Sequence, residues 1–219
     1  SQEHLSFYQR ILMREANQAQ LANSLKMLTE CLFAHHKRAP IVLIDEYDTP
    51  LHAGYVHGFY DEIVPFFRNF LSAGLKDNRC LFKAVLTGIL RISRESLFSG
   101  LNNLKVYSLL ETRFSSYFGF TEPEVMALLQ KAGLQDKFSG IKDWYNGYAM
   151  AGTTIYNPWS IINCIEEGGC LKPFWVNTSD NELIKSLLAG SSGSFKENFE
   201  ALLQGETLES RIDENIVFA

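Results

Sequence analysis

The stretch "APIVLIDEYDTPL", Ala39–Leu51, joins an aliphatic run to a group of acids and decides the fold. Ile41–Ile44 lack the apolar–polar alternation of a strand with one face in water. The run therefore predicts a strand covered on both faces, as in a parallel sheet with helices on each side. Ligands of such sheets bind beyond the carboxyl ends of the strands, and Asp45, Glu46 and Asp48 follow there. Because ionised carboxylates are costly beside apolar neighbours, a bound cation is their candidate partner.

The flanking segments extend this pattern into an alternation of helices and strands. Leucines at helical spacing predict a helix over about Asn17–Ala34 that packs on the sheet. The stretch "YDEIVPFFRNFLSAGLKDN", from Tyr60, predicts a second helix if Pro65 lies in its first turn. Leu81–Gly88, "LFKAVLTG", reads as a second buried strand. This order predicts an α/β fold with a parallel sheet flanked by helices.

Beyond Gly88 the segments become shorter. Val106–Leu110 could form a third parallel strand, and "TEPEVMALLQKAG" predicts a helix with Thr121 as N-cap and Gly133 at its C-terminal end. After Phe138, short helices and turns prevail. We therefore expect an α/β core over residues 1–135 and a small, mainly helical region over residues 136–219.

Composition narrows the function classes. The 219 residues are 46% hydrophobic with a formal charge of −5, and no cluster of basic residues indicates nucleic acid or a membrane surface as partner. Four scattered cysteines in no metal-binding spacing predict reduced thiols in a cytoplasmic protein. No apolar run reaches the roughly 20 residues needed to span a bilayer.

An aliphatic strand that ends in Asp-Glu is the Walker B pattern of ATPases. There the Asp holds Mg²⁺ and the Glu orients the water that attacks the terminal phosphate of ATP. Asp45 and Glu46 fit these roles, and Asp48 is a second candidate metal ligand. An acidic turn at a strand end explains the short pattern about equally well.

Three further residues are candidates for contacts with phosphate. Thr87 ends the second strand, where such ATPases place a residue that senses the terminal phosphate. Arg91 and Arg94 follow, and guanidinium groups match phosphate oxygens bidentately. A helix cap explains Thr87 more often, and an ordinary surface helix explains the arginines equally well. No GxxxxGK(S/T) phosphate-binding loop occurs in the sequence.

Several longer blocks resemble the predicted AAA-ATPase-like proteins of bacteria from about Leu25 onward. These blocks are "IVLIDEYDTPL", "FRNFLSAGLKDN", "AVLTGILRISRESLFSGLNNLKVYSLL", "YFGFTEPEV", "WYNGY", "IYNPWSIIN" and "FWVNTSDNELI". The resemblance implies a P-loop NTPase-like sheet whose Walker A strand lies outside this chain. It also implies ATP and Mg²⁺ as ligands, and a PD-(D/E)XK nuclease-like domain as a possible neighbour in the full protein.

The resemblance also implies roles for single residues. The Walker B positions of the family fall on Asp45 and Glu46, and Asp48 completes its DEYD signature. Thr87 falls on the sensor position and Arg91 on the arginine that follows it. We therefore expect an ATPase module that switches a neighbouring domain or partner and is inactive as this fragment alone.

Two other functions remain open. One is a non-catalytic interaction module that keeps the ATPase fold, although retention of both strand-end acids argues against a degenerate site. The other is a metal-dependent nuclease using Asp45, Glu46 and Asp48, which lacks the Glu-x-Lys that such enzymes carry on a strand.

Overall fold

The computed structural model describes residues 2–89, 97–98, 101, 104–145, 148–176, 191, 193–204 and 206. The chain forms two compact units. Unit 1 comprises Ser1–Leu104 with Asn198–Ala219, and unit 2 comprises Lys105–Glu197. The division after Leu104 precedes the one that the sequence suggested at residue 135. Helix α10 (Gly193–Leu203) spans the second point of division.

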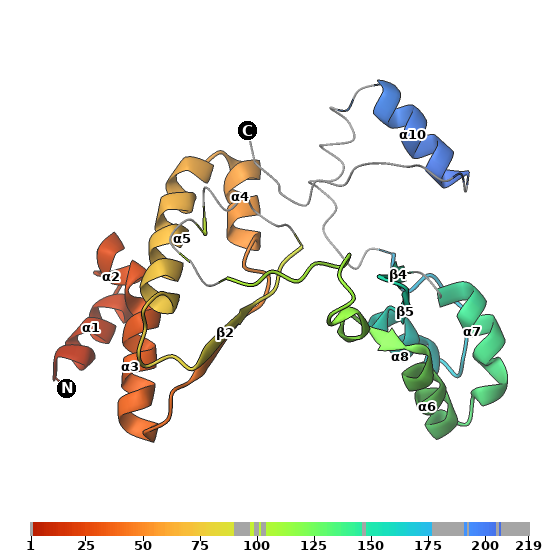
Figure 1. Cartoon of the computed structure of the whole chain (residues 1–219), viewed down its shortest axis with the longest axis horizontal. Helices are drawn as coiled ribbons and strands as arrows, with labels where there is room; N and C mark the ends of the chain where they lie inside the picture. Colours follow the sequence, from red (N-terminus) through yellow and green to blue (C-terminus); the bar gives the residue numbers. More distant parts are fainter. Residues whose placement is uncertain are drawn as a thin grey trace. The chain divides into compact units, whose positions relative to one another are not determined.

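Unit 1 is a mixed α/β structure built around two short strands (Figure 1). Its elements are α1 (Gln2–Leu12), α2 (Gln18–Ala22), α3 (Ser24–His36), β1 (Ile41–Ile44), α4 (Thr49–His57), α5 (Tyr60–Leu75) and β2 (Lys83–Leu86). The strands pair in parallel, with Ile41 opposite Lys83 and Ile44 opposite Leu86. The parallel pairing that the helix–strand alternation predicted is therefore present.

Only one face of this strand pair is covered by the described residues. Ile44 and Leu86 pack against a core that contains Leu71 of α5. On the opposite face, Ile41 is 57% exposed and Leu43 is 74% exposed. The expectation of strands buried on both faces is wrong for the described part of the chain, because helices α4 and α5 supply a layer on one side (Figure 1).

The helix expected over Asn17–Ala34 is two helices. Asn17 and Gln20 form a reciprocal capping box that starts α2. The chain turns at Asn23, whose side chain bonds back to the Ala19 carbonyl at 2.9 Å, and α3 begins at the next residue. Both helices pack against α5. The sequence had predicted that this segment packs on the strands.

Pro65 lies further along helix α5 than the sequence suggested. Pro65 is the sixth residue of α5, in the second turn, so its placement in the first turn was wrong. A proline there removes one hydrogen bond to the carbonyl of Asp61. Pro65 is exposed, so water can satisfy that carbonyl.

Unit 2 combines helices with a small antiparallel sheet that the sequence did not reveal. Its elements are η1 (Ser115–Tyr117), β3 (Phe120–Thr121), α6 (Glu122–Ala132), η2 (Gln135–Lys137), α7 (Phe138–Tyr145), β4 (Tyr148–Met150), β5 (Thr153–Tyr156) and α8 (Pro158–Glu166). The strand order is β3-β5-β4. Ala151 and Gly152 join β4 to β5 with φ values of 45° and 82°, as in a tight hairpin turn.

The two local predictions for unit 2 had different outcomes. Helix α6 starts at the predicted N-cap, Thr121, which forms a capping box with Glu124, and it ends at Gly133 in the left-handed conformation. The strand expected over Val106–Leu110 is wrong, because these residues have no regular structure. Throughout the part of the chain that the structure describes, no helix has the length and apolar character needed to cross a bilayer.

Candidate functional site

Asp45 and Thr87 lie side by side at the carboxyl ends of β1 and β2. The pairing continues past the strands, with the Thr87 N–H donating to the Ile44 carbonyl and the Tyr47 N–H donating to the Thr87 carbonyl, both at 2.9 Å. The Thr87 hydroxyl donates to Oδ1 of Asp45. Both side chains belong to exposed residues. The structure thus brings two of the predicted site residues into direct contact at the open end of the sheet.

Glu46 turns the chain at this point. Its φ of 51° places it in the left-handed region, which is uncommon for a residue other than glycine. Its backbone N–H donates to Oδ1 of Asp45 at 3.1 Å. Its carboxylate accepts from the Thr49 hydroxyl at 3.4 Å, at the start of α4. The two neighbouring carboxylates therefore accept from different hydroxyl groups, that of Thr87 for Asp45 and that of Thr49 for Glu46.

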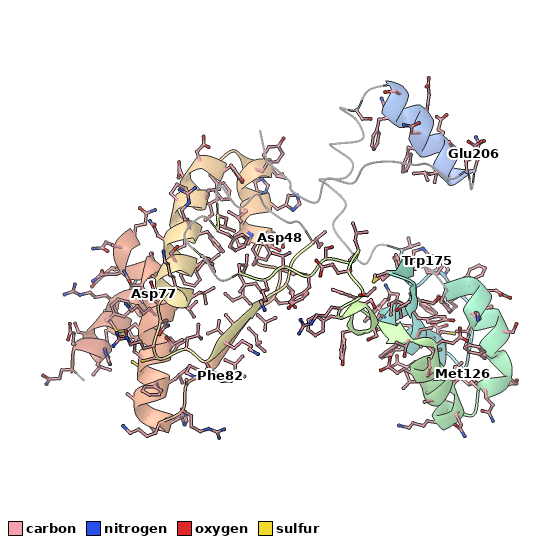
Figure 2. The ribbon with its side chains drawn as sticks, in the orientation of Figure 1. Asp48, Asp77, Phe82, Met126, Trp175 and Glu206 are labelled. Atoms are coloured by element: carbon pink, nitrogen blue, oxygen red, sulfur yellow. The ribbon has the colours of Figure 1, made fainter. Side chains whose placement is uncertain are left out.

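Asp48 is placed differently from both. It lies where α4 begins (Figure 2) and is 5% exposed. Its Oδ2 accepts the N–H of Ile89 at 3.1 Å. This carboxylate therefore contacts the backbone that follows β2, whereas Asp45 contacts a side chain at the end of that strand.

Two residues that sequence reasoning missed complete this arrangement. A Cβ atom built on Gly88 would lie 2.5 Å from Oδ1 of Asp48 and 2.7 Å from the ring of Tyr47. Tyr47 is 9% exposed, and its ring centroid lies 5.4 Å from that of Phe98. A larger residue after Thr87 would therefore have to displace the side chain of Asp48 or Tyr47, and the Thr-Gly pair was the signal that could have indicated this close approach.

Two of the predicted site residues have no described position. Arg91 and Arg94 lie outside the described residues. Among the residues that are described, no group of three His, Cys, Asp or Glu side chains is arranged to hold a metal ion.

The oxygen atoms at the strand ends are ligands for hard cations, of which Mg²⁺ is the one that the sequence predicted. An exposed carboxylate beside a hydroxyl matches Mg²⁺, which binds hard oxygen ligands, usually through one or two carboxylates, and keeps several of its waters. The exposure of Asp45 leaves space for those waters. The donor set thus fits hydrated Mg²⁺ without needing further protein ligands.

Unit 2 holds a separate polar cluster. Glu122 accepts from the Lys142 ammonium at 2.8 Å and from the Tyr156 hydroxyl at 3.3 Å. The hydrogen bond from Lys142 lowers the pKa of Glu122, and burial raises the pKa of Tyr156 to about 12. These contacts tie α6 to α7 and β5, which explains the cluster as part of the packing of unit 2.

Comparison with known proteins gives a family for one part of the chain. The model of a family described as "Predicted AAA-ATPase" matches residues 2–98. This match lies on unit 1 and includes Asp45 and Thr87, whereas the resemblance noted from the sequence extends from about Leu25 over nearly the whole chain. No solved structure matches the chain.

One curated bacterial protein is a relative of this chain. It is described as "Uncharacterized protein in vnfD 5'region" of Azotobacter chroococcum mcd 1 and is 34% identical over 152 residues. The match covers 68% of this chain and 28% of the relative. The chain therefore spans less than a third of that relative.

Proposed function

We propose that this chain is part of an ATPase module, because the model of the family described as "Predicted AAA-ATPase" matches residues 2–98. In the complete protein, ATP binding and hydrolysis would switch a neighbouring domain or partner. The observation that carries the proposal is the pairing of Asp45 with Thr87 at the adjacent carboxyl ends of two parallel strands. Ligands of α/β sheets bind at this edge. We propose that β1 and β2 belong to a P-loop NTPase-like sheet.

Each predicted residue has a role in this proposal. Asp45 would hold Mg²⁺, which neutralises phosphate charge when bound. Glu46 would orient the attacking water, and Thr87 would contact the terminal phosphate. Arg91 and Arg94 would supply positive charge to the phosphate oxygens.

The phosphate-binding loop has to come from another part of the complete protein. The 219 residues contain no Gly-Lys pair followed by Ser or Thr, so this chain supplies the acidic side of the proposed site. The adjoining domain that the module would control is unassigned, and a nuclease-like domain in the same polypeptide is the candidate that the family resemblance suggests.

Substitution of the two strand-end acids tests the proposal in the complete protein. Glu46→Gln should keep nucleotide binding and lose hydrolysis, by about 10²–10³-fold, because the amide cannot accept the proton of the attacking water. Asp45→Ala should weaken Mg²⁺-dependent ATP binding, because the metal-side carboxylate is lost. Phosphate release and titration calorimetry measure the two effects. Hydrolysis that persists in Glu46→Gln would contradict the role of this residue.

The same measurements separate the ATPase from the interaction module. A non-catalytic module would bind its partner equally well with and without ATP, and the complete wild-type protein would release no phosphate. The contacts of Asp45 with Thr87 and of Glu46 with Thr49 favour the ATPase, because both acids sit in defined positions at the strand end.

A further inference from the structure

Asp48 is the N-cap residue of α4, yet its side chain does not cap that helix. An aspartate in this position ordinarily accepts a backbone N–H two or three residues further along its own helix. Asp48 instead accepts the N–H of Ile89 at 3.1 Å, across a sequence separation of 41 residues. Its carboxylate therefore ties the start of α4 to the segment that follows β2.

The surroundings of Asp48 leave little space for a hydrated ion. Its Oδ2 is bonded to the Ile89 N–H, and its Oδ1 lies where a Cβ atom on Gly88 would approach to 2.5 Å. Mg²⁺ needs a nearly octahedral shell of oxygens at about 2.0–2.1 Å, several of them water. Asp48 is 5% exposed, whereas Asp45 is an exposed residue. The two aspartates of the DEYD stretch therefore differ in what they can bind.

The hydrogen bond from Ile89 to Asp48 fixes the chain on the C-terminal side of Thr87. The backbone of Thr87 itself forms hydrogen bonds with the backbone of Ile44 and Tyr47. Two residues further on, Asp48 holds the chain at Ile89. Thr87 thus lies between two fixed points, with its hydroxyl on Asp45.

We propose that Asp48 is a positioning residue, which holds the segment after β2 so that the Thr87 hydroxyl stays on Asp45, and that it does not bind the metal. This inference rests on the proposed function, because Asp45 and Thr87 are the site that it serves. It gives the last acid of the DEYD stretch a different task from the first.

Amide hydrogen exchange of the 219-residue chain, resolved by NMR, tests the hydrogen bond between Asp48 and Ile89 without any nucleotide. Asp48→Ala should speed exchange of the Ile89 amide by roughly tenfold or more, because a hydrogen bond to a carboxylate is lost. Asp48→Asn keeps an oxygen acceptor and should restore most of the protection. Thr87→Val is the matched control, since it removes a neighbouring hydroxyl and leaves the bond between Asp48 and Ile89 intact.

Two outcomes of the exchange experiment would overturn the proposal. One is unchanged exchange at Ile89 in Asp48→Ala, and the other is equal loss of protection in Thr87→Val. If Asp48→Ala does not fold, Gly88→Ala replaces it, because the added methyl group collides with Oδ1 of Asp48 and should release the Ile89 amide in the same way.

The Mg²⁺ dependence of ATP hydrolysis by the complete protein separates positioning from metal binding. Asp45→Asn should raise the Mg²⁺ concentration for half-maximal hydrolysis by about tenfold or more. Asp48→Ala, which removes the acceptor of the Ile89 N–H, should lower kcat and leave that concentration within about twofold of the wild-type value. Equal shifts would make Asp48 a metal ligand and overturn the proposal. If the wild-type protein hydrolyses no ATP, the proposed function fails, and the exchange result alone decides the place of Asp48.

Discussion

At the scale of single residues, Tyr156 shows how burial changes ionisation. Its side chain has no exposed surface, and its hydroxyl donates to Glu122 at 3.3 Å. Burial, assisted by the negative charge of Glu122, raises the pKa of Tyr156 to about 12. Burial also raises the pKa of Tyr145 to about 12. Because the ordinary pKa of tyrosine is about 10, both phenols bind their protons more tightly in the folded state than in the unfolded state.

This difference predicts that unit 2 loses stability in alkali. A pKa raised on folding stabilises the native state fully below about pH 10, and the stabilisation is lost as the pH rises towards about 12. Tyr156→Phe should therefore make the free energy of unfolding fall less steeply between about pH 10 and pH 12. The three tryptophans, Trp144, Trp159 and Trp175, all lie in unit 2, so tryptophan fluorescence during urea unfolding reports on this unit.

Tyr117, which is 82% exposed, provides the matched control. Tyr117→Phe should leave the pH profile of unit 2 unchanged. An equal change of slope in both variants would mean that burial of Tyr156 is not the cause.

The sequence predicted part of the site at this scale. Asp45 and Thr87 could be placed because each directly follows an aliphatic run, and the ends of neighbouring parallel strands meet at one edge. The left-handed backbone of Glu46 and the contact of Gly88 with Asp48 could not be placed. Both depend on how the chain turns after its strand, which adjacent residue types do not determine.

At the scale of elements, the β1–β2 pair has one covered face and one open face. This predicts unequal costs for substitutions on the two sides. Leu43 is 74% exposed, so Leu43→Ser should lower the free energy of unfolding by less than about 1 kcal/mol. Leu71 of α5 is fully buried, so Leu71→Ala should cost about 2–5 kcal/mol. Urea unfolding followed by far-ultraviolet circular dichroism measures both changes.

The comparison of these two leucines also tests whether the face is open in solution. If Leu43→Ser cost as much as Leu71→Ala, another chain or segment would have to cover the face. Sedimentation of the wild-type chain would then show whether self-association provides that cover.

Elements with local signals were predictable, and elements that depend on distant partners were not. The capping box of Thr121 and Glu124 marks the start of α6 in the sequence itself. The apolar run of β1 predicted two buried faces, but burial depends on what packs against the strand rather than on the strand. The turn between β4 and β5 was missed because alanine seldom adopts the positive φ that Ala151 has here.

At the scale of the whole molecule, each unit has its own core. The core of unit 1 contains Leu51, Val64 and Leu71, and the core of unit 2 contains Leu129 and Ile141. Asp45, Glu46, Asp48 and Thr87 all belong to unit 1. The described residues of the proposed nucleotide site therefore lie within one unit.

The last prediction concerns these 219 residues by themselves, which should neither bind Mg-ATP tightly nor hydrolyse it. P-loop enzymes hold the β- and γ-phosphates with consecutive backbone N–H groups, a helix N-terminus and a lysine. The sequence contains no such loop, and charge-assisted hydrogen bonds of this kind are each worth roughly 1.5–3 kcal/mol. Asp45 and Glu46 would repel the polyphosphate in the absence of such donors. Titration calorimetry of the purified chain with Mg-ATP measures the affinity, and Asp45→Ala is the control for a contribution from the metal. A micromolar dissociation constant would contradict the prediction and reveal a phosphate site of another kind within these residues.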